Sequence, residues 1–239
     1  MIVTEDAVPS VLVSLIRKSA RAALGQYNEF RLVLAGGSLL SLLATPEFHS
    51  NPVGEYGRWT VFLADERFVP FESDDSNGGL IFRRLMQGTR LEAAELVRVN
   101  GTTVEEAAAG YETRLLQMQS QNRPLFDLAV LGMGPDGHIA SLFPPLYEPK
   151  GLAVAVRNSP KPPAARVSLT IDALSKAKDV LFVVTGDGKR AAVNRVFLEG
   201  DLTMPACQLP KAHWLLDEAA GRDLGGHLKA IGQVDLARF

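Results

Sequence analysis

The chain has 239 residues, of which 46% are hydrophobic and 22% charged, a composition typical of a soluble globular protein. This composition excludes a disordered chain and a collagen-like repeat, and the single cysteine, Cys207, excludes an internal disulfide. The net charge of −2 gives no electrostatic footprint for nucleic acid, although it leaves room for a local basic pocket that binds a small anion.

No segment of the sequence predicts export or membrane insertion. Residues 1–10 contain Glu5 and Asp6 and no basic region before an apolar run, which is unlike a signal peptide. No stretch approaches the ~18 apolar residues that a membrane span needs. We therefore expect a cytoplasmic protein that has no membrane or nucleic-acid partner and forms a single domain over residues 1–239.

Apolar runs alternate with segments of helical periodicity along the chain. The expected elements, in chain order, are a helix over 5–25, strands over 31–35 and 59–64, a helix from Ser76-Asn77 to about Met86, a helix that begins at Thr103 with Glu106 in capping-box spacing and runs to about Ser120, strands over 126–131, 167–170 and 180–184, a helix from Gly188 to about Leu198, and a strand over 213–216. This pattern predicts an α/β fold with an open, mostly parallel sheet covered by helices on both faces, similar to a Rossmann fold. The proline-rich segment 144–163 is expected to be an excursion from that one sheet.

Polar loops follow three of these strands, and two of the loops contain glycine. They are Gly36-Gly37-Ser38, Asp65-Glu66-Arg67, and Gly132 through His138. Open α/β sheets bind ligands beyond the carboxyl ends of their strands. We therefore expect these loops, together with residues 186–189, to converge on one site.

The loop from Gly132 to His138 permits two functional interpretations. It matches the dinucleotide-binding pattern G-x-G-x-x-G. That interpretation is disfavoured, because Pro144-Pro145 leave no room for a crossover helix and no acidic residue follows about 20 residues on. The second interpretation is catalytic: the imidazole of His138, beside the carboxylate of Asp136, titrates near neutral pH and can accept a proton from water. We favour it over a histidine that only stabilises its loop.

Two other loops have the chemistry of anion binding. Gly36-Gly37-Ser38 opens a helix, where backbone N–H groups and the helix dipole favour negative charge, although a plain tight turn would look the same. Lys189 follows a glycine-rich turn that is not a P-loop, and it is either a phosphate ligand or a solvated lysine. The four histidines and one cysteine show no zinc-site spacing, so we expect no metal.

Several of these segments together resemble the glucosamine-6-phosphate isomerase/6-phosphogluconolactonase family. The block FDLAVLGMGPDGHIASLFP, residues 126–144, is similar to the lactonase signature. Residues 65–70 (DERFVP) with Ser76-Asn77 resemble the second family motif, and residues 166–170 and 214–220 resemble later blocks. The similar segments run from Gly36 to Ala220.

The resemblance implies hydrolysis of 6-phospho-D-glucono-1,5-lactone to 6-phosphogluconate in the cytosolic pentose phosphate pathway, without metal or cofactor, by an enzyme that we expect to be a monomer. It assigns His138 as the general base. We expect Asp136 either to orient the imidazole and stabilise its charged form or only to cap the turn. The resemblance places the phosphate near Gly36, Gly37, Ser38 and Lys189, and it makes Asp65, Arg67, Asn77 and Arg166 part of the substrate pocket.

Two departures and two alternatives accompany this resemblance. Leu39 stands where the family usually has a threonine, and either Arg83 or Arg84, or neither, takes the place of a family arginine. The related glucosamine-6-phosphate deaminases have a carboxylate where this chain has Phe143, which favours the lactonase. A catalytically inactive protein that binds sugar phosphates is the other alternative.

Overall fold

A seven-stranded parallel sheet is the centre of the molecule. The computed structural model describes residues 1–50, 56–145 and 150–225, and its main sheet has the order β1-β10-β9-β6-β2-β3-β5. Every neighbouring pair in it is parallel, which confirms the expected fold class. The strands are β1 (Ile2–Val3), β2 (Phe30–Leu34), β3 (Trp59–Leu63), β5 (Glu95–Leu96), β6 (Phe126–Leu131), β9 (Ala177–Val184) and β10 (His213–Asp217). Strands β3 and β6 are buried along their whole length, as expected for a sheet covered on both faces.

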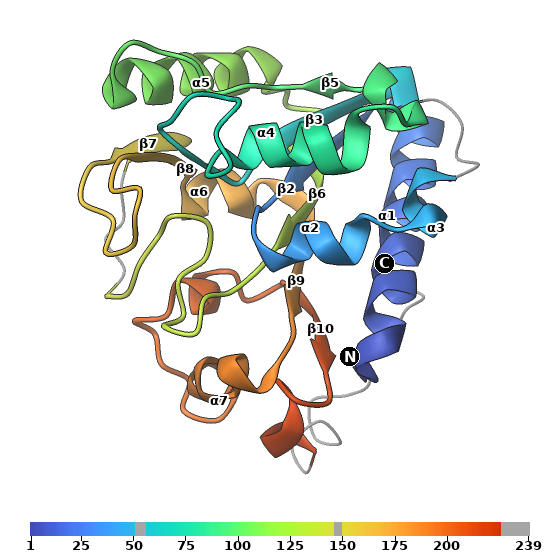
Figure 1. Cartoon of the computed structure of the whole chain (residues 1–239), viewed down its shortest axis with the longest axis vertical. Helices are drawn as coiled ribbons and strands as arrows, with labels where there is room; N and C mark the ends of the chain where they lie inside the picture. The colour runs from blue at the N-terminus through green and yellow to red at the C-terminus, as the bar shows by residue number, and fades with distance from the viewer. Residues whose placement is uncertain (51–55, 146–149, 226–239) are drawn as a thin grey trace.

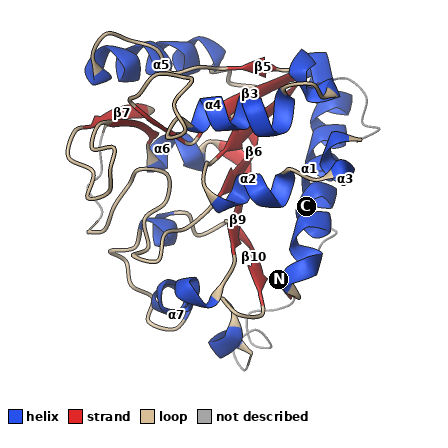
Figure 2. Ribbon diagram, in the orientation of Figure 1, coloured by secondary structure: helices blue, strands red, loops and turns tan. Residues whose placement is uncertain are grey.

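Helices cover this sheet on both sides (Figure 1). They are α1 (Val8–Tyr27), α2 (Ser38–Leu43), α3 (Pro46–His49), α4 (Asn77–Ile81), α5 (Val104–Met118), α6 (Ile171–Ser175) and α7 (Arg190–Phe197), with short 3-10 turns and a π-helical turn (Phe82–Met86) between them. In the view of Figures 1 and 2, α1 lies on one side of the sheet and α6 on the other. Helix α1 buries Leu12, Ile16 and Ala20, which recur every four residues and so form one apolar face.

Side-chain caps begin two of the helices that the sequence predicted. The hydroxyl of Ser76 accepts a hydrogen bond from the backbone N–H of Gly79 at the start of α4. The hydroxyl of Thr103 accepts one from the N–H of Glu106 at the start of α5. The carboxylate of Glu106 returns to the N–H of Thr102 rather than to that of Thr103, so the predicted capping box is only half formed.

The order of the strands places a crevice between β2 and β6. The chain runs outward from β2 to β3 and β5 and then returns to β6 on the opposite side of β2, with Leu34 level with Val130. The loops that leave these two neighbouring strands therefore start at the same edge of the sheet. Such a reversal of strand order is where open α/β sheets bind ligands.

A second, three-stranded sheet corrects two expectations. Residues 65–67 are not a loop but strand β4 (Asp65–Arg67), which pairs antiparallel with β8 (Arg166–Leu169). The run expected at 167–170 belongs to this small sheet, whose third strand is β7 (Ala153–Val156), and not to the parallel sheet. The excursion at 144–163 thus includes a strand, and its residues 146–149 lie outside the described residues. Local patterns missed this sheet because the pairing of β4 with β8 joins segments about a hundred residues apart.

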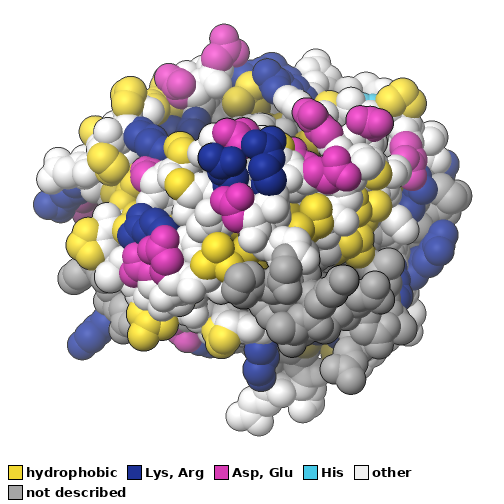
Figure 3. Space-filling model, turned by 90° about the horizontal axis from the view of Figure 1, so that it is seen from below, with side chains coloured by type: hydrophobic (Ala, Val, Ile, Leu, Met, Phe, Trp, Pro, Cys, Tyr) yellow, Lys and Arg dark blue, Asp and Glu magenta, His cyan; other side chains and the backbone are white. Residues whose placement is uncertain are grey.

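The surface has no strong charge asymmetry on the face that Figure 3 shows. There, among the described residues, Lys and Arg side chains alternate with Asp and Glu side chains, in keeping with the net charge of −2. Within the described ranges we find no helix with the length and apolarity needed to cross a bilayer.

Candidate active site

A cavity of about 320 Å³ lies beyond the carboxyl ends of the central strands. The loop after β2, strand β4, the loop after β6 and the turn that holds Lys189 all contribute to its wall. The structure therefore brings the predicted loops together at one site. Of the residues singled out from the sequence, the cavity is lined by Gly36, Gly37, Ser38, Asp65, Arg67, Asn77, His138, Arg166 and Lys189, with Asp136 directly behind His138.

The imidazole of His138 is held between a carboxylate and an aromatic ring. Its Nδ1 lies 2.5 Å from Oδ1 of Asp136. On its face the ring of Phe143 stacks with centroids 4.6 Å apart and an interplanar angle of 29°. The side chain of His138 is 19% exposed, so the imidazole is fixed but open on one side.

These contacts determine which nitrogen of His138 can act as a base. The pKa of Asp136 is raised by burial, but the hydrogen bonds with His138 and Lys161 outweigh this and bring it down to about 2. Asp136 is therefore an acceptor only, so Nδ1 of His138 must donate to it and Nε2 is left with a free lone pair. Burial lowers the pKa of His138 below its ordinary value, with Asp136 opposing this and Lys161 adding to it. A neutral imidazole with a free Nε2 is the form that a general base requires.

Glycines give the loop after β6 its close turns. Gly137 adopts φ 89°, a left-handed conformation that favours glycine. Gly134 has a different role, since a Cβ atom there would overlap with the His138 imidazole and the Asp136 carboxylate. The G-x-G-x-x-G pattern thus serves to pack a histidine and an aspartate against the backbone. No crossover helix follows: residues 138–142 form a turn closed between Ile139 and Leu142.

Positive charge dominates the wall of the cavity. Four cationic side chains of the described residues line it, together with the carboxylate of Asp65. Burial lowers the pKa of Lys189, and the nearby Lys161 lowers it further. Cations that repel one another in a partly desolvated space are stabilised by an anionic ligand. The four are Arg67, Lys161, Arg166 and Lys189.

A buried polar network forms the wall around Asp65. Its carboxylate accepts a hydrogen bond from the hydroxyl of Ser141 at 2.6 Å and one from the amide of Asn77 at 3.2 Å. The amide of Asn77 also donates to the backbone carbonyl of Asp65 at 2.9 Å. The carbonyl oxygen of the Asn77 side chain packs against Gly36, where a Cβ atom would overlap with it. Asp65, Asn77 and Gly36 therefore support one another across the base of the cavity.

Arg166 uses most of its donors on the protein itself. Its Nε donates to the carbonyl of Pro163 at 3.0 Å, and its Nη2 donates to the carbonyls of Lys161 and Pro162 at 2.8 and 3.2 Å. Its Nη1 donates to the hydroxyl of Ser141 at 3.4 Å and lies 3.9 Å from Oδ2 of Asp65, with which it forms an ion pair. Arg166 therefore fastens the loop 161–163 to the site.

Lys161 is a residue that the sequence reasoning missed. Its Nζ lies 3.1 Å from Oδ2 of Asp136 and 3.3 Å from Nδ1 of His138. It belongs to the proline-rich segment, which we set aside as an excursion from the sheet. A lysine flanked by Pro160 and Pro162 was the available signal, since prolines restrict the backbone and can hold a side chain in place.

The structure also resolves the question of the arginines after the Ser-Asn segment. Arg83 donates to the carbonyls of Phe71 and Ser73, away from the cavity. Among the residues that the structure describes, the cavity wall includes neither Arg83 nor Arg84. Leu39, which replaces the usual threonine, does line it.

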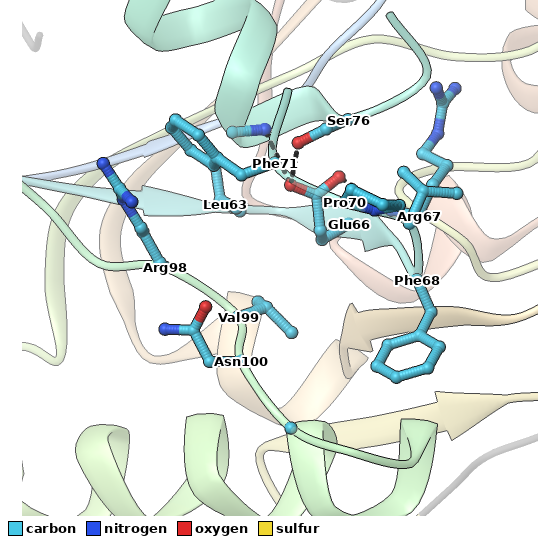
Figure 4. Close-up of a pocket in the computed structure, with 13 residues that line it drawn as sticks. Leu63, Glu66, Arg67, Phe68, Pro70, Phe71, Ser76, Arg98, Val99 and Asn100 are labelled. Atoms are coloured by element: carbon cyan, nitrogen blue, oxygen red, sulfur yellow. Dashed lines mark hydrogen bonds between the residues drawn. The ribbon is translucent and has the colours of Figure 1, made fainter. Parts of the chain in front are cut away.

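A second cavity, of about 420 Å³, lies on the other side of β4 (Figure 4). Successive residues of a strand point to opposite faces, so Glu66 faces this cavity while Asp65 lines the first one. Arg67, at the end of β4, borders both cavities. The Glu66 carboxylate accepts hydrogen bonds from the backbone N–H groups of Arg67, Asn77 and Gly78 and from the hydroxyl of Ser76. Burial raises the pKa of Glu66, and these hydrogen bonds oppose the rise. With both carboxylate oxygens fully used, Glu66 fastens the start of α4 to β4.

Metal chemistry has no evident ligand set in the described residues. Within them, no three His, Cys, Asp or Glu side chains are grouped as they would be around a metal ion. His227, the fourth histidine, lies outside the described residues.

Known proteins share both the sequence and the fold of this chain. The rat 6-phosphogluconolactonase is 39% identical over 224 residues, which are 88% of this chain and 87% of the relative. The human 6-phosphogluconolactonase is 39% identical over 227 residues, covering 89% and 88%. The crystal structure of 6-phosphogluconolactonase from Thermotoga maritima superimposes with a TM-score of 0.80 at 29% identity, over 91% of this chain and 98% of that one.

The family model described as glucosamine-6-phosphate isomerases/6-phosphogluconolactonase matches residues 3–216. This span runs from β1 into β10 and contains all the loops that form the cavity. The chain therefore belongs to the glucosamine-6-phosphate isomerase/6-phosphogluconolactonase family.

Proposed function

We propose that this protein is a 6-phosphogluconolactonase, which hydrolyses 6-phospho-D-glucono-1,5-lactone to 6-phosphogluconate in the oxidative branch of the pentose phosphate pathway. The observation that carries the proposal is the His138–Asp136 pair on the wall of a cationic cavity. The similarity of most of the chain to proteins named 6-phosphogluconolactonase supports the same substrate.

The His138–Asp136 pair provides the base that lactone hydrolysis needs. Nε2 of His138 accepts a proton from water as the water oxygen bonds to the lactone carbonyl carbon. When the tetrahedral intermediate collapses, the bond from that carbon to the ring oxygen breaks, and the imidazolium returns its proton to the leaving oxygen. Asp136 stabilises the imidazolium formed between these steps, and general-base help of this kind accelerates a reaction by roughly 10²–10⁴-fold.

The cations of the cavity are suited to the two negative charges of the reaction. The phosphate group is assigned to Lys189 and the Gly36-Gly37-Ser38 loop, which lie on its wall. The oxyanion is assigned to Arg67 or to backbone N–H groups of the loops, where a good donor is worth about 3 kcal/mol. Asp65, Asn77 and Arg166 shape the pocket through the network around Asp65.

The remaining expectations are part of the same proposal. Residues 1–239 act as one domain, as a monomer in the cytoplasm, on a small phosphosugar and without a metal or cofactor. Hydrolysis of an activated ester needs a base, water and oxyanion donors. The chain's own side chains and backbone N–H groups offer the base and the donors, and the solvent supplies the water.

A coupled assay tests the proposed function. 6-Phosphogluconolactone is generated freshly, its spontaneous hydrolysis is subtracted, and 6-phosphogluconate is detected with its dehydrogenase. We expect turnover of the lactone and none of glucosamine 6-phosphate, which is the control substrate. Release of ammonia from glucosamine 6-phosphate would instead show a deaminase. Binding of 6-phosphogluconate without any turnover of the lactone would show an inactive sugar-phosphate binding protein.

A further inference from the structure

Lys161 lies beside the His138–Asp136 pair on the cavity wall and contacts both partners. We propose that Lys161 is a positioning residue: it holds the Asp136 carboxylate against Nδ1 of His138, and its charge keeps the imidazole neutral in mildly acidic solution. Its Nζ is 3.1 Å from Oδ2 of Asp136 and 3.3 Å from Nδ1 of His138. The inference rests on the proposed function, in which His138 acts as the base.

The acceptors available near Lys161 determine which atom its ammonium group binds. Nδ1 of His138 donates to Oδ1 of Asp136, so it has no lone pair to offer to an ammonium group. The bond that Lys161 makes is therefore to Oδ2 of Asp136. Each carboxylate oxygen then has its own donor, which fixes the rotation of the carboxylate and, through it, the plane of the imidazole.

Hydrogen bonds from Arg166 hold the backbone of Lys161 in place. The three carbonyls that Arg166 binds belong to residues 161–163, and Arg166 itself is 3% exposed and lies on β8. Strand β8 pairs with β4, which also carries Asp65. A buried arginine thus fastens the backbone of Lys161 to the same small sheet that forms one wall of the cavity.

Charges from several elements act on His138, and they differ in sign. Asp136 from its own loop and Asp65 from β4 favour the imidazolium, whereas Lys161 disfavours it. Lys189, from the turn before α7, interacts with Lys161 and Asp136. Lys161 therefore lets Asp136 orient the imidazole without the increase in basicity that an unopposed carboxylate would cause. The side chain of Lys161 is 41% exposed, so its replacement should leave the fold intact.

The test compares Lys161→Met, Lys161→Arg and a matched control, Lys178→Met. Lys178 is exposed near the start of β9, whereas the cavity lies beyond the end of that strand. For each variant, kcat and KM are measured from pH 5 to pH 8, with spontaneous hydrolysis subtracted. The titration of His138 is followed separately by NMR, with its signal assigned from its absence in His138→Asn.

We expect Lys161→Met to move the acid limb of kcat/KM upward by about 0.5–1 pH unit, because the imidazolium loses a repelling neighbour that is partly screened by solvent. The NMR midpoint of His138 should move in the same direction, while Lys161→Arg and Lys178→Met keep the wild-type limb. If the acid limb of kcat/KM does not move in Lys161→Met while KM increases strongly, Lys161 binds the phosphate instead, and the inference is overturned. If the lactonase assay itself fails, the NMR titration still decides the effect of Lys161 on His138.

Discussion

Replacing Gly134 with alanine tests whether the packing of His138 against its loop is what activity depends on. A Cβ atom built on Gly134 would lie 2.1 Å from Nδ1 of His138 and 2.3 Å from Oδ1 of Asp136. The backbone of Gly134 is not free to move away, because its N–H donates to the carbonyl of His138 and its carbonyl accepts from the N–H of Gly137. The imidazole must therefore withdraw by roughly 1 Å or more, and such a displacement at a reacting group can cost about 10²-fold.

We expect kcat of Gly134→Ala to fall by at least ~10²-fold, up to the ~10⁴-fold that complete loss of a general base would cause. Gly25→Ala is the matched control, since Gly25 is exposed on α1 and a Cβ there meets nothing within 4 Å. It should keep full activity and raise the free energy of unfolding by up to about 1 kcal/mol. The assay is single-substrate kinetics beside urea unfolding of both variants. Full activity in a folded Gly134→Ala, or a loss explained by unfolding alone, would refute the reasoning.

Three further predictions follow from the same geometry. Burial holds the pKa of His138 below 6.5, and the base must be neutral to act. The value of kcat/KM should therefore stay level as the pH is lowered from neutral to about 6.5, and should fall only below that. The variant His138→Asn should lose ~10²–10⁴-fold in kcat at every pH. Lys189→Ala should raise KM by the equivalent of roughly 1.5–3 kcal/mol with little change in kcat, and an unchanged KM would remove Lys189 from the phosphate site. Glu66→Gln should lower the free energy of unfolding by about 1–3 kcal/mol in urea titrations, since an amide nitrogen cannot accept the N–H of Gly78, and wild-type stability would contradict that role.

Local features of the sequence determined the main strands of the parallel sheet and the loop that carries His138 and Asp136. Buried strands and amphipathic helices are encoded by short apolar periods, so β2, β3, β6, β9 and β10 were predictable from the sequence. His138 and Asp136 are two residues apart, and the turn between them depends on nearby glycines. The convergence of the loops on one cavity followed from the parallel sheet, because the carboxyl ends of parallel strands lie at one edge.

Tertiary pairing decided the rest of the site. The three-residue strand Asp65–Arg67 carries no apolar period of its own, and it becomes a strand because it pairs with β8, about a hundred residues away. That pairing turns Glu66 away from the cavity and sets Arg166 opposite Arg67 on the cavity wall. There Arg166, which was expected to bind substrate, spends most of its donors on the carbonyls of residues 161–163 just before it in the chain. Lys161 reaches His138 from 23 residues further along the chain. Contacts of this kind depend on which segments the fold brings side by side, and a local periodicity holds no information on that choice.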